Sequence, residues 1–172
     1  MSLFRKILPI FLTLIILIIA SVVILHYGHT LPGRVATHFG SSGQPNGWMT
    51  RAEIIQVSLL FQWGFALLLP TLMAIIRFLP SEYINVPNAN YWRMPENFIR
   101  GLNFLFFYSF WLCVLDAIFT IGIFLLMVDA NRNLPVVING KAMFLLLGAF
   151  LLGILIWIIR LILYFRNEGS EK

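Results

Sequence analysis

Long runs of apolar residues alternate with short polar segments along the whole chain. Four of these runs cover approximately residues 7–27, 54–79, 102–128 and 142–164. At 1.5 Å of rise per residue, a helix made from any of them crosses the roughly 30 Å hydrocarbon core of a bilayer. Because a membrane-spanning segment must satisfy its own backbone hydrogen bonds, we expect an all-α membrane protein with four transmembrane helices in one membrane domain, residues 1–172.

Local signals predict where these helices begin. Thr50 and Glu53 have the spacing of a capping box, so the second helix should begin near Arg51. Met94-Pro95-Glu96 places a proline and an acidic residue in the first turn of the third helix, and Asn139-Gly140 precedes the fourth.

The basic residues predict the orientation of the helices. Of the twelve Lys and Arg residues, eight lie on the side of the two termini and four on the other side. The more basic side of a membrane protein faces the cytoplasm, so we expect both termini there. The eight are Arg5, Lys6, Arg77, Arg93, Arg100, Arg160, Arg166 and Lys172, and the four are Arg34, Arg51, Arg132 and Lys141.

The outer loop, residues 28–53, has the pattern of a structured segment. Residues 34–39 have a strand-like composition, and residues 43–47, Gly-Gln-Pro-Asn-Gly, favour a turn in which Asn46-Gly47 tolerates a positive φ. Residues 135–138 of the second outer connection are also strand-like. We expect the two strand-like segments to pair as a small β element over the bundle.

Composition excludes several classes of protein. Hydrophobic residues make up 60% of the chain and charged residues only 11%, whereas soluble domains carry about 25% charged residues. The net charge of +5 is not arranged as a basic stripe with interleaved aromatics, so we expect no nucleic-acid binding. Cys113 is the only cysteine, which rules out an internal disulfide.

Two loop motifs resemble a known family. The outer loop reads LPGRVATHFG over residues 31–40 and GQPNGW over residues 43–48, and the inner loop reads NYWRMPE over residues 90–96. This combination resembles the bacterial membrane family of domain of unknown function 1648, of which SdpI-like immunity proteins are relatives. The resemblance implies a cytoplasmic membrane protein with a role in toxin immunity or signalling. The last two helices show no match to the further immunity region of those relatives.

Histidines gather at the outer end of the first helix. His26 and His29 are three residues apart, which puts them on one face if the helix continues, and His38 or Glu53 would complete a zinc site. The alternative is that these are interfacial polar residues and that His38 hydrogen-bonds within the loop.

Asp116 lies near the middle of the third apolar run. An acid at that depth costs about 2.5–3.5 kcal/mol on insertion scales, so it should face the bundle interior. Gln62 or the Trp63 indole is the expected hydrogen-bond partner. Asp116 is then either a ligand or proton contact or a packing device between helices.

Several loop residues are candidates for partner recognition. His38, Phe39, Pro45 and Trp48 form a candidate surface on the outer loop, although Trp48 also suits the headgroup level. Tyr83, Tyr91 and Trp92 of the inner loop suit an aromatic belt. The inner-loop motif residues are Asn90, Tyr91, Trp92, Pro95 and Glu96.

These features leave three functions open. The leading one is a non-enzymatic binding, toxin-immunity or signalling role with an extracellular peptide or protein ligand. The second is a metal-dependent enzyme or metal sensor that uses the outer histidines. The third is a small proton-coupled transporter centred on Asp116, which would require a homo-oligomer. No nucleophile with its base, phosphate loop or carboxylate pair is recognisable, which favours a protein that is not an enzyme and needs no cofactor.

Overall fold

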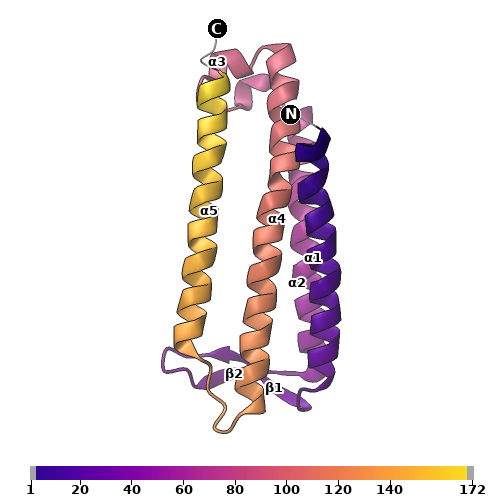
Figure 1. The fold of residues 1–172 in the computed structure, drawn as a ribbon, viewed down its shortest axis with the longest axis vertical. Coiled ribbons are helices and arrows are strands. Elements are labelled where there is room, and N and C mark those ends of the chain that lie inside the picture. The colour runs from indigo at the N-terminus through magenta and orange to yellow at the C-terminus, as the bar shows by residue number, and fades with distance from the viewer. Residues whose placement is uncertain (1–2, 170–172) are drawn as a thin grey trace.

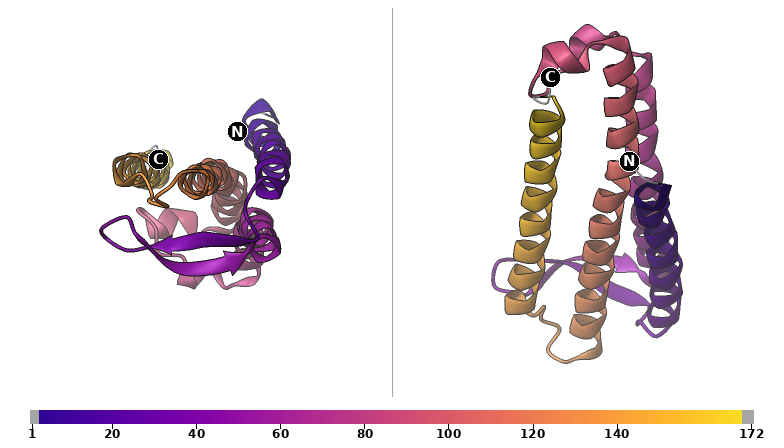
Figure 2. Two further views of the ribbon diagram at one scale, coloured as in Figure 1. Left: turned by 90° about the horizontal axis from the view of Figure 1, so that it is seen from below. Right: turned by 45° about the horizontal axis from the view of Figure 1, so that its top comes forward.

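Four long helices run along one another in the structure, a computed structural model that describes residues 3–169 (Figure 1). They are α1 (Leu3–His29), α2 (Arg51–Ile75), α4 (Pro95–Arg132) and α5 (Gly140–Glu168). Helices α1, α2 and α4 pack against one another, and α5 packs against α4. The end-on view in Figure 2 shows α5 at one side of this group, next to α4 and away from α1.

Each of these four helices is long and apolar enough to cross a membrane, and no other helix among residues 3–169 meets that description. The prediction of four helices able to span a membrane is therefore confirmed. Helix α1 begins and α5 ends at the same end of the bundle, which we call the termini end (Figure 1). Lys172, one of the residues that predicted the orientation, lies outside the described residues.

The helices begin where the local signals predict. Thr50 caps α2, with its side chain accepting a hydrogen bond from the Glu53 backbone N–H while the Glu53 carboxylate accepts one from the Thr50 N–H. Pro95 opens α4, and the Asn139 side chain caps α5. Helix α4 begins seven residues before the predicted apolar run because Pro95 and Glu96 suit a first turn.

Two layers of apolar side chains hold the three packed helices together. The layer nearer the loops contains buried Ile24, Val35, Phe124 and Val128 from α1, the outer loop and α4. In the middle layer, Leu17 packs among three small side chains, those of Ala66, Cys113 and Ala117. Small side chains let helices approach closely within a membrane, where the lipid provides no hydrophobic force that would drive them together.

The predicted β element exists, but its partner strand was wrong. Strand β1 (Arg34–Phe39) pairs antiparallel with β2 (Pro45–Thr50), both within the first loop. Residues 135–138 form no strand, and only the Ile138 N–H donates to the Gly43 carbonyl at the tip of this hairpin, at 3.1 Å. A hairpin needs a much shorter loop than pairing with a distant segment, and Pro135 has no N–H to offer a ladder.

The hairpin turn also lies earlier than predicted. The chain reverses over residues 40–44, where the Gly40 N–H donates to the Gln44 carbonyl at 2.8 Å. Gly43 has a φ of +80°, a conformation that favours glycine. Asn46 and Gly47, the expected positive-φ pair, lie within β2 instead.

At the termini end, the inner loop holds the end of α5. The loop contains two short 3₁₀ turns, η1 (Ile76–Phe78) and η2 (Ser81–Tyr83), and the short helix α3 (Ala89–Trp92). Trp92 is 0% exposed and its indole N–H donates to the Phe165 carbonyl at 2.8 Å. The prediction of an aromatic belt is therefore wrong for Trp92, because the inner loop folds back and buries this ring against α4 and α5.

We predict that Trp92→Ala lowers the free energy of unfolding by about 3–5 kcal/mol, because it empties a packed site and removes the bond to Phe165. Trp92→Phe should cost about 1–3 kcal/mol, because it keeps most of the ring but leaves a buried carbonyl unpaired. The measurement is unfolding in mixed detergent micelles with increasing sodium dodecyl sulfate. Tyr83→Ala is the control, because Tyr83 in the same loop is 71% exposed; an equal loss in both variants would contradict the buried role of Trp92.

Candidate functional site

A groove of about 640 Å³ lies between α2, α4 and α5 at the end of the bundle where the hairpin lies, opposite the termini end. We call this end the loop end. The hairpin closes it through Thr37, His38 and Phe39. Phe61 of α2 and Phe144 of α5 also line it and are 67% and 77% exposed, so the groove is open at the surface of the bundle. We call this the hairpin groove. Its remaining lining is formed by Gly40, Ser41, Gly43, Ile54, Val57, Ser58, Asp116, Phe119, Thr120, Ile123, Phe124, Met127, Ile138, Gly140 and Met143.

The hairpin is held over the groove by Asn131, near the end of α4. The Ala36 N–H donates to the Asn131 Oδ1 and the Asn131 amide donates to the Ala36 carbonyl, each at 2.8 Å. Asn131 thus pairs with Ala36 as a neighbouring strand would, and Val35 and Ala36 are both 0% exposed. This contact fixes the hairpin to α4. It could not be predicted from the sequence, because an asparagine near a helix end is equally suited to cap its own helix.

The pairing of β1 with β2 is irregular on both sides of His38, between Ala36 and His38 and between His38 and Phe39. Ala36 pairs with Trp48 but His38 pairs with Gly47, which leaves Thr37 as the extra residue of a bulge. A Cβ on Gly47 would lie 2.7 Å from the His38 Cβ, so the absence of a side chain at Gly47 makes room for the imidazole. The His38 Nδ1–H donates to the Asn46 Oδ1. The ring is therefore oriented by its own hairpin, and Nε2 remains as the second polar atom.

Asp116 is the acidic residue of the hairpin groove. Its half-buried side chain comes from the middle of α4, about one turn from Phe119 and Thr120. Within residues 3–169 its carboxylate has no hydrogen bond or ion pair. The groove therefore brings His38 and Phe39 from the loop and Asp116 from a helix to a single apolar space, a combination that sequence spacing could not reveal.

The expected partners of Asp116 do not bond it. The Trp63 indole N–H donates to the Ser21 hydroxyl of α1 at 2.9 Å. Gln62 is 1% exposed and does not line the groove, and its side-chain amide has no partner among the described residues. Gln62 belongs to a buried stripe at every fourth position of α2, with Ile54, Ser58, Ala66 and Pro70. Ile54 and Ser58 of this stripe line the groove, whereas Gln62, farther along α2, is buried in the bundle and does not reach it.

Pro45 and Trp48 lie outside the groove. Pro45 pairs with Phe39 at the start of β2. Trp48 is 42% exposed, and the Arg34 guanidinium lies 5.1 Å from the centre of its ring. The structure therefore separates the four outer-loop candidates into a groove pair, His38 and Phe39, and two residues on the rest of the hairpin.

The expected zinc ligands are not brought together. His26 is exposed and its ring lies edge-on to Tyr27, and Glu53 is engaged in the capping box. His29 is exposed, and its carbonyl accepts a hydrogen bond from Arg51. Across residues 3–169, no three side chains of His, Cys, Asp and Glu come close enough to hold a metal ion.

The inner-loop motif serves mainly to build the termini end. The Tyr91 hydroxyl accepts a hydrogen bond from Arg100, and the Tyr91 carbonyl accepts one from the Asn97 amide. Pro95 and Glu96 form the first turn of α4, and Asn90 is exposed beside a shallow hollow at the loop.

Part of the chain, which includes the hairpin, matches a known family model. Residues 14–61 match the model of a domain of unknown function, DUF1648. This segment of the chain is therefore similar to a DUF1648 domain. The match covers less than a third of the chain, from the middle of α1 through the hairpin to the middle of α2, and it confirms the resemblance carried by the outer loop. No curated protein and no solved structure matches the chain.

We predict that Asn131→Ala detaches the hairpin locally, because the buried N–H and carbonyl of Ala36 lose their partner. An unsatisfied buried group costs about 1–3 kcal/mol, so the Ala36 amide should exchange its hydrogen at least about tenfold faster. Hydrogen exchange read by mass spectrometry on the peptide over residues 31–39 measures this.

Asn133→Ala is the matched control for this prediction. Asn133 lies one residue past α4, is exposed, and its amide bonds only to Asp129. Unchanged exchange in Asn131→Ala, or equal acceleration in both variants, would show that Asn131 does not hold the hairpin.

Proposed function

We propose that this multi-pass protein with a segment similar to a DUF1648 domain is a non-enzymatic binding protein of the bacterial cytoplasmic membrane. Its hairpin groove receives an apolar or amphipathic peptide from outside the cell, in a toxin-immunity or signalling role. The observation that carries the proposal is that His38, Phe39 and Asp116 line one groove whose other lining is mainly apolar and which is open at the surface of the bundle. The excess of basic residues at the termini end supports a cytoplasmic location for that end.

The groove has the chemistry of a binding site for a peptide already in the membrane. Its aromatic and aliphatic walls favour apolar side chains, and its few polar groups fix orientation. The Asp116 carboxylate has no partner of its own, so a Lys, Arg or backbone N–H of the ligand supplies one. A charge-assisted hydrogen bond in such surroundings is worth about 1.5–3 kcal/mol.

Binding, and not catalysis, fits this arrangement best. His38 and Asp116 are the titratable residues that line the groove, and they come from its cap and its wall. No nucleophilic cysteine or cluster of metal ligands joins them within the described residues. The SdpI-like relatives implied by the resemblance protect cells from a secreted peptide toxin, and a groove at the outer surface suits such a role.

We predict that expression of the protein in a sensitive bacterial strain raises the inhibitory concentration of at least one cationic amphipathic secreted peptide. The measurement is growth inhibition against a panel of purified peptides. Asp116→Asn should remove about tenfold or more of that protection, because it deletes the charge that meets the peptide. His38→Ala should weaken protection as well, because it removes the polar group of the cap.

Asp129→Asn is the matched control, because Asp129 is an exposed acid on the same helix and outside the groove. Western blotting of membranes shows whether each variant accumulates equally. Absence of protection against every peptide in the panel would contradict the immunity role, and full protection by Asp116→Asn would contradict the role of the groove.

A further inference from the structure

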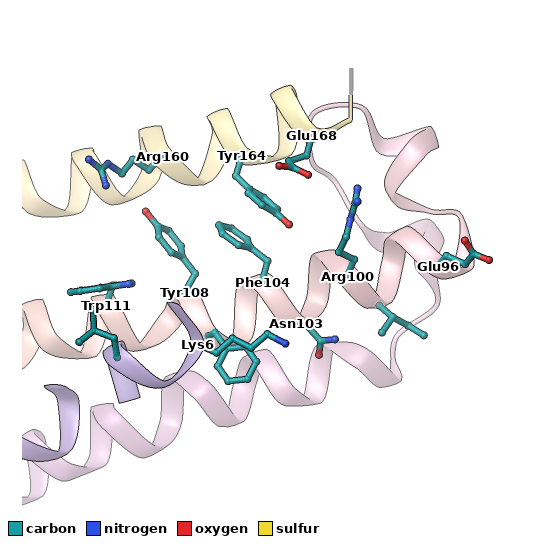
Figure 3. A pocket seen from close by; sticks show the side chains of 13 residues that line it. Lys6, Glu96, Arg100, Asn103, Phe104, Tyr108, Trp111, Arg160, Tyr164 and Glu168 are labelled. Atoms are coloured by element: carbon teal, nitrogen blue, oxygen red, sulfur yellow. The ribbon is translucent and has the colours of Figure 1, made fainter. Parts of the chain in front are cut away.

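A second groove of about 730 Å³ lies at the termini end, between the start of α1, the first half of α4 and the end of α5 (Figure 3). Each of these helices contributes one cation, namely Lys6 from α1, Arg100 from α4 and Arg160 from α5. We propose that this groove binds the headgroup of an anionic phospholipid. The proposal goes beyond the hairpin groove and does not depend on it.

The depth of the cations matches the level of lipid headgroups. Nineteen residues separate Lys141 and Arg160 on α5, and at 1.5 Å each they span about 30 Å, the thickness of the hydrocarbon core. The apolar span of α1 likewise runs from Lys6 to His29. Lys6 and Arg160 therefore lie at one membrane surface when His29 and Lys141 lie at the other.

The charges are arranged to accept an anion near the membrane. Lys6 and Arg160 have no carboxylate within 4.0 Å in the part of the chain that the structure describes. The two acids of the groove, Glu96 and Glu168, stand in the first turn of α4 and near the last turn of α5, where the groove reaches the termini end (Figure 3). The groove therefore carries a cation without a carboxylate partner on each of its two outer helices, Lys6 on α1 and Arg160 on α5, at different positions along the groove (Figure 3).

Arg100 of α4 is the third cation of the groove, and contacts with the inner loop orient its side chain. Its guanidinium donates to the Tyr91 hydroxyl and lies 5.1 Å from the centre of the Trp92 ring. Figure 3 shows this side chain extending from α4 toward α5, into the space between them. The inner-loop motif, which the hairpin groove does not use, therefore orients a cation of the second groove.

The floor of the groove suits the rest of a lipid molecule. Phe104, Tyr108 and Trp111 line it along α4, and Trp111 is 39% exposed on the membrane side. Aromatic rings at the headgroup level contact acyl chains with their apolar faces and the interface with their polar atoms. Basic pockets between transmembrane helices are known to hold anionic headgroups for these reasons.

The test titrates the full-length protein in neutral detergent with phosphatidylglycerol or with phosphatidylcholine and follows tryptophan fluorescence, to which Trp111 contributes from the groove floor. We expect phosphatidylglycerol to bind more tightly than phosphatidylcholine. The double variant Lys6→Gln/Arg160→Gln should lose about 30-fold of this preference, on the basis of about 1 kcal/mol for each basic residue. Arg77→Gln is the control, because Arg77 is exposed near the same end but does not line the groove.

Three outcomes would overturn the proposal. The first is equal affinity of the wild-type protein for the two lipids, which needs no variant and so does not depend on variant folding. The second is an undiminished preference in the double variant. The third is displacement of phosphatidylglycerol by millimolar inorganic phosphate, which would identify the groove as a site for a free anion instead of a lipid.

Discussion

The pair of hydrogen bonds between Asn131 and Ala36 is the contact on which the loop end of the molecule depends. A hairpin placed over membrane helices has an edge strand with unpaired backbone groups, and such groups are costly near lipid. The Asn131 side chain bonds both the N–H and the carbonyl of Ala36, as the backbone of a neighbouring strand would. The position of His38 and Phe39 over the hairpin groove follows from this attachment.

The two grooves exist because α5 is held at its ends and along one face only. At the termini end, the Phe165 and Arg166 carbonyls accept hydrogen bonds from Trp92 and Asn88. Along its length, aromatic rings join it to α4, including Tyr108 stacked on Trp157 and Phe119 on Phe150. The side of α4 that faces α2 is left open near the loops, and the side that faces α1 is left open near the termini.

The features that sequence could predict are those set by neighbouring residues. The apolar runs, the Thr50–Glu53 capping box and the Pro95 start of α4 each depend on a few adjacent positions. The strand partner of residues 34–39 was wrong because composition marks a strand without marking its neighbour. Trp92 was misplaced for a similar reason, since an aromatic residue in a loop suits an interface and a core equally until the chain is folded.

The sequence singled out His38, Phe39 and Asp116 separately, but their common groove could not be predicted because its lining is divided between distant parts of the chain. The DUF1648 segment, residues 14–61, supplies the cap with His38 and one wall from α2. Asp116 and the opposite wall come from α4 and α5, which the family match does not reach. Asp116, the acidic residue of the groove, therefore lies outside the segment that the family comparison identifies, and only the folded chain brings it to the cap.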